Sequence, residues 1–409
     1  MHIAFRAQPL YNSGMLLLTI FLLFIGNGLP NSLLGSAWTA ICAATGAPLS
    51  AAGTISMVVM AGPILSCLFI GALLKRFRTE QLALVGGVIA AASVAGFGFV
   101  KSTVWLYVLA APLGLGMGLL DSAISLYVAR RFGAKQISWL NCSWGVGAML
   151  GPVIMSRALA AGSWRGGYFR VALIQGAILV ALVLSMPIWR KAAAAEAAAK
   201  EESPAQGTPI TKFMRRPMFP VVILCVMLYF GVELGFGLWG GSYLTVARGV
   251  DPARAALLVS LFYGAMTVGR FFTGFLTAVI PNRNIIRFGM CGMLAGLALL
   301  FLPGDGALGF AVYGLGCAPV FPCTLHEMKA RFGEIDAAAH LGVVLGISRL
   351  GLAIFPELIG KIATATNFFA FLPMLLALCG VMIALSETAN RMVDRQQASA
   401  GKREESAHA

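Results

Sequence analysis

Long apolar segments separated by short polar loops run through almost the whole chain. Twelve of them are each long enough, at about 1.5 Å per residue, to cross the roughly 30 Å hydrocarbon layer of a membrane. The short alternating runs typical of transmembrane barrel strands do not occur, so the pattern predicts helices. The predicted spans are 13–40, 50–75, 80–100, 104–129, 138–161, 167–189, 218–246, 253–279, 284–302, 306–330, 337–363 and 367–388.

The twelve segments divide into two sets of six that repeat one another. Leu113–Gly133 matches Tyr313–Gly333 at an offset of 200 residues: Gly-Leu-Gly recurs near the start of both stretches, and Arg-Phe-Gly closes both. Chance similarity between glycine-rich helices is disfavoured because both ends of the match share one register. Two homologous six-helix halves are typical of a transporter whose substrate site lies at the interface between them.

The predicted fold is therefore an all-α membrane protein with twelve transmembrane helices in two pseudo-symmetric six-helix bundles. We expect the bundles over 1–189 and 218–388. Residues 190–217 contain the helix-favouring run KAAAAEAAAKEE and predict a helical cytoplasmic linker, whereas the polar residues 389–409 predict a disordered cytoplasmic tail. Glycines and prolines predict close packing and kinks in two spans, at Gly26, Gly28 and Pro30 in the first and at Gly314, Gly316, Pro319 and Pro322 in the tenth.

Composition supports a membrane protein and disfavours metal and redox chemistry. Of 409 residues, 59% are hydrophobic and only 11% are charged, too few charges to cover the surface of a soluble protein. The eight cysteines are scattered through apolar segments and the four histidines form no ligand spacing, so we expect no disulfide, metal or other cofactor. No Walker motif or enzyme constellation occurs, and the Gly-x-Gly of the fourth span follows no strand and is not a dinucleotide loop.

The net charge of +14 is concentrated in alternate loops, which argues against nucleic-acid binding. This bias places both termini in the cytoplasm. We expect a monomeric, multi-pass protein of the bacterial cytoplasmic (inner) membrane, with the lipid bilayer, protons and a small polar solute as its partners.

Acidic and basic residues within the spans are the candidates for ion coupling. Asp121 is the one acid well inside the first half, and because burial disfavours its charged form it could exchange a proton near neutrality. The alternative is a structural ion pair or a polar packing contact. Glu233 is the matching acid in the second half, but pairing with Arg270 or Arg349 is favoured over proton coupling. The two arginines could instead bind an anionic substrate, although Glu233 and Glu357 are available to neutralise them.

Amide and aromatic side chains that share helix faces are the candidates for substrate binding. Amides exchange hydrogen bonds with hydroxyl groups, and aromatic faces cover the C–H side of a sugar ring. The alternative for the aromatic residues is a place in the core or in an interfacial belt. The candidates are Asn27, Asn31, Trp38, Asn141, Trp144, Trp239, Tyr243 and Tyr263.

The two halves, the basic central loop and the basic loop after the second span resemble the major facilitator superfamily. Its loop motif, Gly-x-x-x-Asp-Arg-x-Gly-Arg, is degraded here at residues 71–78, where Lys75 replaces the Asp and Arg78 the second Gly. Longer phrases resemble the fucose permease-like, fucose–galactose–glucose:proton symporter branch. They are GLPNSLLGSAW (28–38), SWLNCSWGVGAMLGP (138–152), SWRGGY (163–168), GVELGFGLWG (231–240), TVGRFFTGF (267–275) and GLGCAPVFP (314–322).

The resemblance runs from Leu16 to Leu385 and implies alternating access and proton-driven sugar uptake, with acids in the first and fourth spans. Asp121 matches the acid position of the fourth span, but Asn31 stands where related sequences commonly have Asp. Because Asn cannot take up a proton, either Asp121 carries the coupling alone, or the chain is uncoupled, or Asn31 only contacts substrate.

Two functions compete at this point. The first is proton-coupled import of a monosaccharide or similar small polar solute, and the second is a proton-antiport exporter of drugs or metabolites. Antiporters of the superfamily often carry Gly-x-x-x-Gly-Pro followed by Gly-Gly in the fifth span. Here Gly147–Pro152 has the first part and lacks the second, which favours import. A third function, as a receptor or scaffold that does not transport, is disfavoured because no extra domain is predicted that would support it.

Overall fold

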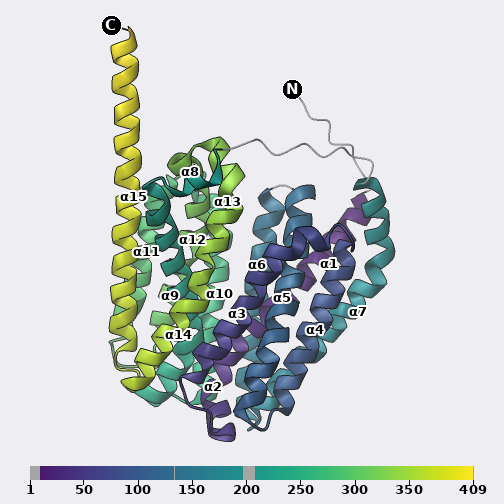
Figure 1. The fold of residues 1–409 in the computed structure, drawn as a ribbon. Helices are drawn as coiled ribbons and strands as arrows, with labels where there is room; N and C mark the ends of the chain where they lie inside the picture. Colours follow the sequence, from purple (N-terminus) through teal and green to yellow (C-terminus); the bar gives the residue numbers. More distant parts are fainter. Residues whose placement is uncertain (1–9, 133, 197–207, 409) are drawn as a thin grey trace. The chain divides into compact units, whose positions relative to one another are not determined.

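The computed structural model describes residues 10–132, 134–196 and 208–408, and all regular structure in these ranges is helical (Figure 1). Ten helical segments of the described chain are long and apolar enough to cross a membrane. Helices α6 (Ala134–Ala160) and α11 (Asn282–Leu299), which fall outside that set, occupy the predicted fifth and ninth spans. The observed helices thus follow all twelve predicted spans, and the fold class predicted from the sequence is confirmed.

The chain divides into two compact units. Unit 1 comprises Met1–Pro48, Val58–Glu202 and Pro252–Ser260, and unit 2 comprises Leu49–Met57, Ser203–Asp251 and Leu261–Ala409. Residues 49–57, at the start of the second span, belong to unit 2, and residues 252–260, at the start of the eighth span, belong to unit 1.

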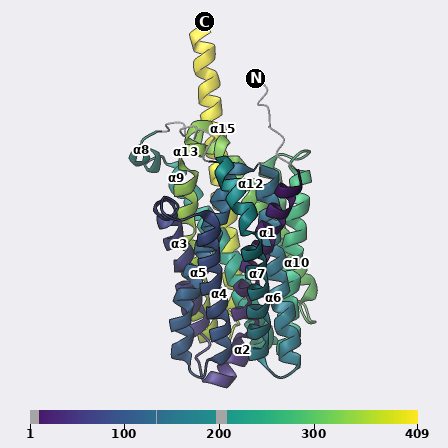
Figure 2. The ribbon, with the colours of Figure 1, turned by 90° about the vertical axis from the view of Figure 1, so that its right-hand side faces the viewer.

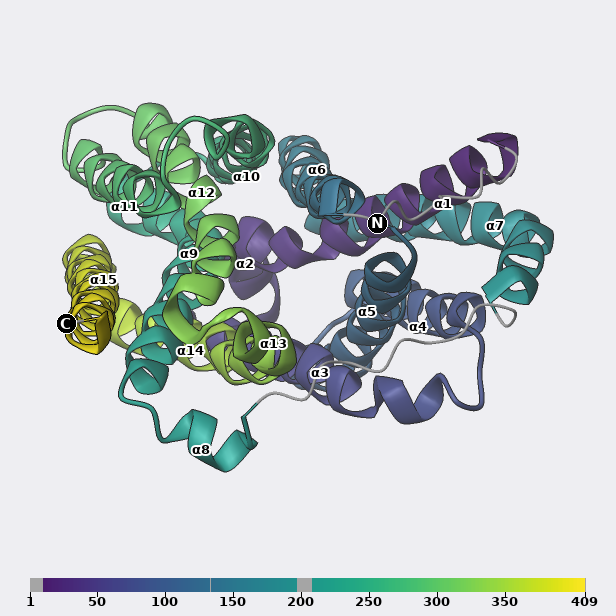
Figure 3. The ribbon, with the colours of Figure 1, turned by 90° about the horizontal axis from the view of Figure 1, so that it is seen from above.

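The helices of the first half are α1 (Leu10–Gly28), the 3-10 helix η1 (Leu29–Ser32), α2 (Leu33–Thr45), α3 (Ala51–Leu73), α4 (Thr79–Phe99), α5 (Thr103–Arg131), α6 (Ala134–Ala160) and α7 (Trp164–Glu196). Helix α4 packs against both α5 and α7 (Figure 3), and α1 packs against α6 and α7. The apolar interior of this unit includes Phe24, Ile124, Tyr127 and Trp189.

The helices of the second half are α8 (Ile210–Met214), α9 (Met218–Arg248), α10 (Pro252–Leu276), α11 (Asn282–Leu299), α12 (Ala307–Phe332), α13 (Glu334–Ser348), α14 (Leu350–Ala365) and α15 (Phe371–His408). Helix α9 packs against α14 and α15, and the short α8 lies against α9 (Figure 2).

Glycines in the two matching stretches make equivalent close contacts in both halves. A Cβ atom at Gly114 would overlap the carbonyl oxygen of Val59 in α3, and one at Gly314 would overlap the carbonyl of Phe262 in α10. Two residues on, Gly116 meets α4 and Gly316 meets α11. Each glycine pair lets a fourth helix approach the second and third helices of its own half. The sequence repeat is therefore a packing repeat.

The ends of several elements differ from the sequence prediction. Helix α15 continues to His408, so the prediction of a disordered tail after Thr388 was wrong (yellow in Figure 1). The tail contains many good helix formers, and a helix already started in the span extends without the cost of nucleation. The predicted linker helix is seen as a continuation of α7 to Glu196 and as α8, while 197–207 lie outside the described residues.

The two spans with predicted kinks differ from each other. The first is interrupted by η1, whereas α12 is one helix that runs through Pro319 and Pro322. A further interruption, which the sequence analysis did not predict, separates α13 from α14 at Arg349.

Candidate functional site

Pro30 shapes the break in the first span. In a regular helix the carbonyl oxygen of Gly26 would accept from the N–H of residue 30, and proline has no N–H. The side chain of Gln175, from α7, supplies the missing donor: its Nε2 donates to the Gly26 oxygen at 2.9 Å. The break is therefore completed by a residue from another span of unit 1.

The next carbonyl along the break also takes a side-chain donor. Asn31 Nδ2 donates to the backbone oxygen of Asn27 at 2.9 Å. Ser32 Oγ donates to the backbone oxygen of Ala148 in α6 at 2.8 Å, which joins the break to the fifth span. Asn31 thus uses its N–H group on its own helix, a bond that an ionised Asp at this position could not make.

The fifth span approaches the break closely because both helices carry glycine there. A Cβ atom at Gly147 would overlap the carbonyl oxygen of Ile25, and one at Gly28 would overlap that of Trp144. Gly151, in turn, lies against the carbonyl of Leu29. The Gly147–Pro152 motif of the sequence analysis is therefore used here to pack α6 against the first span.

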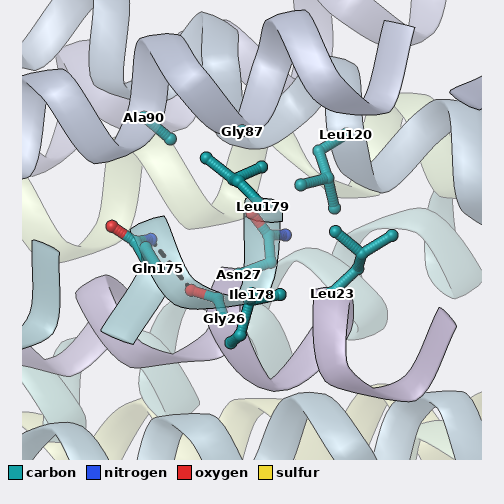
Figure 4. Close-up of a pocket in the computed structure, with 9 residues that line it drawn as sticks. All are labelled: Leu23, Gly26, Asn27, Gly87, Ala90, Leu120, Gln175, Ile178 and Leu179. Carbon is teal, nitrogen blue, oxygen red and sulfur yellow. Dashed lines mark hydrogen bonds between the residues drawn. The ribbon is translucent and has the colours of Figure 1, made fainter. Parts of the chain in front are cut away.

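A small cavity lies beside the break, within unit 1 (Figure 4). The centre of a water molecule could move within about 10 Å³ of it. Its lining residues come from four helices: Leu23, Gly26, Asn27, Gly87, Ala90, Leu120, Gln175, Ile178 and Leu179. Asn27 and Gln175 are 5% and 6% exposed, and among the described residues neither Asn27 Oδ1 nor Gln175 Oε1 has a hydrogen-bond partner.

The other candidates of unit 1 differ in exposure. Asp121 and Trp144 are partly buried and Asn141 is exposed, with its Nδ2 donating to the backbone oxygen of Ile137 at 3.0 Å. Trp38 is fully buried. Asp121 directly follows Leu120, which lines the cavity beside Asn27. The arrangement brings Asn27 and Asn31 together at the break.

In unit 2, an ion pair lies among buried tyrosines. Arg270 Nη2, from α10, lies 2.9 Å from Glu233 Oε1, from α9, and both side chains are 12% exposed. Tyr229, one turn before Glu233, donates its hydroxyl to the backbone oxygen of Cys317 at 2.9 Å. Tyr263 is 3% exposed, with its hydroxyl against Gly237. Of the two partners weighed for Glu233, the structure places Arg270 in contact with it.

A second polar group in unit 2 surrounds Glu357. Its carboxylate accepts from Thr54 Oγ1 at 3.0 and 3.1 Å and lies 3.0 Å from the ammonium of Lys361. Gly53 allows the first turn of α3 to lie against Glu357, since a Cβ there would collide with it. Glu357 is 7% exposed, so the described structure holds this buried carboxylate with one cation and one hydroxyl.

Trp239 is a packing residue in this structure. Its indole is fully buried, its Nε1 donates to the backbone oxygen of Pro356 at 2.7 Å, and Gly360 lies against the ring. Tyr243 is 8% exposed. Arg349 is partly buried and lies at the break between α13 and α14.

On the cytoplasmic side predicted from the loop charges, Asp336 fixes the end of the linker. Its carboxylate accepts from the backbone N–H of Thr208 at 2.7 Å, from the Thr208 hydroxyl at 2.9 Å and from Arg216 at 2.6 Å. The hydrogen bonds from Thr208, and then the Arg216 guanidinium, hold the pKa of Asp336 below its usual value of 3.8.

Sequence reasoning missed several residues of these clusters. Gln175 carried a signal, as a lone amide within an apolar span, which is costly unless it bonds. Thr54 and Lys361 carried none, since neither their spacing nor their type relates them to Glu357. Among the described residues, no group of three or more His, Cys, Asp or Glu could hold a metal ion.

Comparison with known proteins places these features in context. The family model described as Major Facilitator Superfamily matches residues 16–356. The cis,cis-muconate transport protein of Acinetobacter baylyi is 23% identical over 352 residues, covering 82% of this chain and 84% of that protein. The sodium-dependent glucose transporter 1A of Mus musculus is 23% identical over 394 residues, covering 87% and 91%.

Other matches are partial or structural. The yeast (Saccharomyces cerevisiae) bypass of stop codon protein 6 is 22% identical over 313 residues, which cover 67% of this chain and 61% of that protein, less than two thirds of its length. The crystal structure of the nucleoside transporter NupG has a TM-score of 0.74 at 12% identity, covering 93% of this chain and 98% of that one. At this identity the likeness supports the fold alone.

Proposed function

Because this chain belongs to the Major Facilitator Superfamily and is a membrane transporter rather than an enzyme, we propose that it imports a monosaccharide or similar small polar solute together with protons. Transport proceeds by alternating access, with Asp121 as the proton carrier. The observation that supports Asp121 as the proton carrier is the ion pair between Glu233 and Arg270, which engages the other candidate acid.

That ion pair supports Asp121 over Glu233 as the coupling acid. Glu233 contacts a guanidinium at 2.9 Å in a desolvated setting, where removing its charge by protonation would leave Arg270 buried and uncompensated. The contact with Arg270 supports a structural role for Glu233. We therefore assign coupling to Asp121, a partly buried acid of the fourth span.

A neutral polar solute suits the amide groups that the structure leaves accessible. Asn141 is exposed and Asn31 partly exposed, and an amide oxygen in either place can accept from a hydroxyl. Trp144 is the partly exposed aromatic candidate, whereas Trp38 and Trp239 are fully buried. The glucose transporter among the relatives, which matches most of this chain, supports the sugar class.

The test is uptake into proteoliposomes that contain the full chain. Counterflow with a labelled panel of hexoses and cis,cis-muconate first identifies a solute, without any imposed ion gradient. Uphill uptake is then measured under an inward proton gradient, an inward sodium gradient, or neither. Wild type should accumulate one hexose under the proton gradient, and Asp121→Asn should exchange that hexose without accumulating it.

The control variant is Asp394→Asn, which removes an acid that is 61% exposed and should leave accumulation unchanged. Accumulation driven by sodium alone would replace the proton assignment, and accumulation that persists in Asp121→Asn would remove that residue from the mechanism. Exchange of muconate and of no hexose would overturn the sugar assignment.

The second candidate is transport of an organic anion. It is favoured by the muconate relative, which covers 82% of this chain, and by the partly buried Arg349. An anionic solute would need a cation in the spans, and Arg349 lies at the break between α13 and α14. Under this alternative Arg349→Gln should abolish muconate exchange, whereas under the sugar proposal hexose exchange persists in that variant.

A further inference from the structure

Gln175 and Pro30 both affect the same backbone carbonyl, that of Gly26, at the first-span break. Pro30 removes the donor that the Gly26 carbonyl would use in a regular helix, and Gln175 Nε2 contacts that same oxygen at 2.9 Å from α7, 149 residues along the chain. A buried carbonyl without a donor is costly, especially within a bilayer, where no bulk water can serve it. The Gln175 bond removes this cost.

The amide oxygen of Gln175, unpaired within the described chain, supports a specific role for the hydrogen bond from Nε2 of that amide to the Gly26 carbonyl. Gln175 is 6% exposed, and its Oε1 has no hydrogen-bond partner among the described residues. Apart from Asn27, the other side chains along the cavity, such as Leu179 and Ile178, are apolar (Figure 4). An apolar side chain would avoid the burial of Oε1, so the amide is explained by what its Nε2 does.

The break also positions the residues that follow it. Asn31, directly after Pro30, turns its Nδ2 back onto the carbonyl of Asn27, and Ser32 bonds to α6. Two successive carbonyls, those of Gly26 and Asn27, therefore take side-chain donors in place of the helical pattern. Loss of the Gln175 bond would free the first of them and loosen the start of the break.

We propose that Gln175 is a positioning residue that stabilises the Pro30 break and thereby orients Asn31 toward the transported solute. The orientation of Asn31 toward solute rests on the proposed function, whereas the stabilisation of the break does not. Gln175 itself touches no solute in this account. It acts through the Gly26 carbonyl.

A double-mutant cycle tests the stabilisation without any transport assay. Pro30→Ala restores an N–H to residue 30, so the Gly26 carbonyl regains a donor within its own helix and no longer needs Gln175. Methionine is similar in size to glutamine and has no hydrogen-bond donor. Gln175→Met should therefore lower the apparent Tm more when residue 30 is Pro than when it is Ala. The expected difference in apparent Tm is about 1–3 °C for the purified full chain.

Two further variants keep the cycle interpretable. Ser185→Ala, also on α7, removes a buried hydroxyl that bonds within its own helix, and its effect should be the same in both backgrounds. Gln175→Glu keeps a donor when its carboxyl is protonated, so it should retain the stability of wild type at acidic pH and lose it as the carboxyl ionises. Equal effects of Gln175→Met in both backgrounds would overturn the pairing.

Transport kinetics then separate positioning from stability. Gln175→Met should raise the KM for the solute several-fold and change kcat less, because Asn31 is misplaced. The Pro30→Ala/Gln175→Met double variant should regain stability and still transport poorly, because the break itself is gone. Recovery of stability together with full transport would overturn the positioning role. If the cycle behaves as expected and no hexose is transported by wild type, the break pair stands and the proposed function fails.

Discussion

Removing one member of the buried ion pair in unit 2 should destabilise the protein more than removing both. Glu233 and Arg270 are 2.9 Å apart with side chains 12% exposed. Two charges about 4 Å apart attract by about 4 kcal/mol at an effective dielectric constant of about 20, while each ion loses several kcal/mol of solvation. The attraction and the loss of solvation nearly cancel, so the pair as a whole contributes little to the free energy of unfolding. Either charge without its partner keeps its desolvation cost. Glu233→Met or Arg270→Met should each lower the free energy of unfolding by about 3–5 kcal/mol. The double variant should have a free energy of unfolding close to that of wild type, or higher.

The assay is reversible unfolding in mixed micelles or bicelles, followed by tryptophan fluorescence for the four members of the cycle. The matched control is Arg287 and Glu387, which are 2.6 Å apart with side chains 50% and 31% exposed. Replacing either of these with Met should change the free energy of unfolding by about 1 kcal/mol or less. If the two single effects at Glu233 and Arg270 simply add in the double variant, the reasoning from desolvation is refuted.

Four other predictions follow from single contacts. Asn31→Asp should cost about 1–2 kcal/mol in free energy of unfolding, because an ionised carboxylate cannot donate to the Asn27 carbonyl. Gly147→Ala should cost about 1–3 kcal/mol and lower the yield of folded protein in size-exclusion chromatography, because its methyl group overlaps a carbonyl of the first span. Trp239→Phe should cost about 0.5–1.5 kcal/mol in free energy of unfolding in the same assay, because the side-chain hydrogen bond to the Pro356 carbonyl is lost. Asp336→Asn should raise hydrogen exchange in α8 at neutral pH. Because the folded pKa of Asp336 is lowered, its stabilising effect is complete above the usual 3.8 and is lost as pH falls through the lowered value, so wild type should show the same increase only at that acidity.

The positions of the spans along the sequence could be predicted because each span is itself a long run of apolar residues. A run of apolar residues about twenty long marks a helix whatever surrounds it, since only a helix satisfies its own backbone within lipid. Pro30 likewise predicts the break in the first span, because the missing backbone N–H of proline is a local property of the sequence. The break at Arg349 had no such mark.

Contacts between spans were harder to predict because they depend on register across the fold. The sequence offered Arg270 and Arg349 as partners for Glu233, and only the packing of α9 against α10 places Arg270 there. Asn27 was grouped with Asn31 as a substrate contact from helical spacing. The structure shows that Asn27 lines a cavity inside unit 1, where its role as a substrate contact stays a prediction.

Gln175 shows the limit of residue type as a guide. A buried amide in an apolar span indicates that some partner exists, but the partner is a backbone carbonyl exposed by a proline in a different span. No periodicity in either span relates the two. The relation becomes visible only when α7 is placed beside the break.

The most direct test of the central claim is proton movement caused by the solute itself. Proteoliposomes that contain a trapped pH-sensitive dye receive the solute identified by counterflow, with no gradient imposed. With proton-coupled import through Asp121, the lumen should acidify as solute enters through wild type, and Asp121→Asn should admit solute without a change in lumenal pH. A lumen whose pH does not change with wild type, or one that still acidifies with Asp121→Asn, would contradict this mechanism.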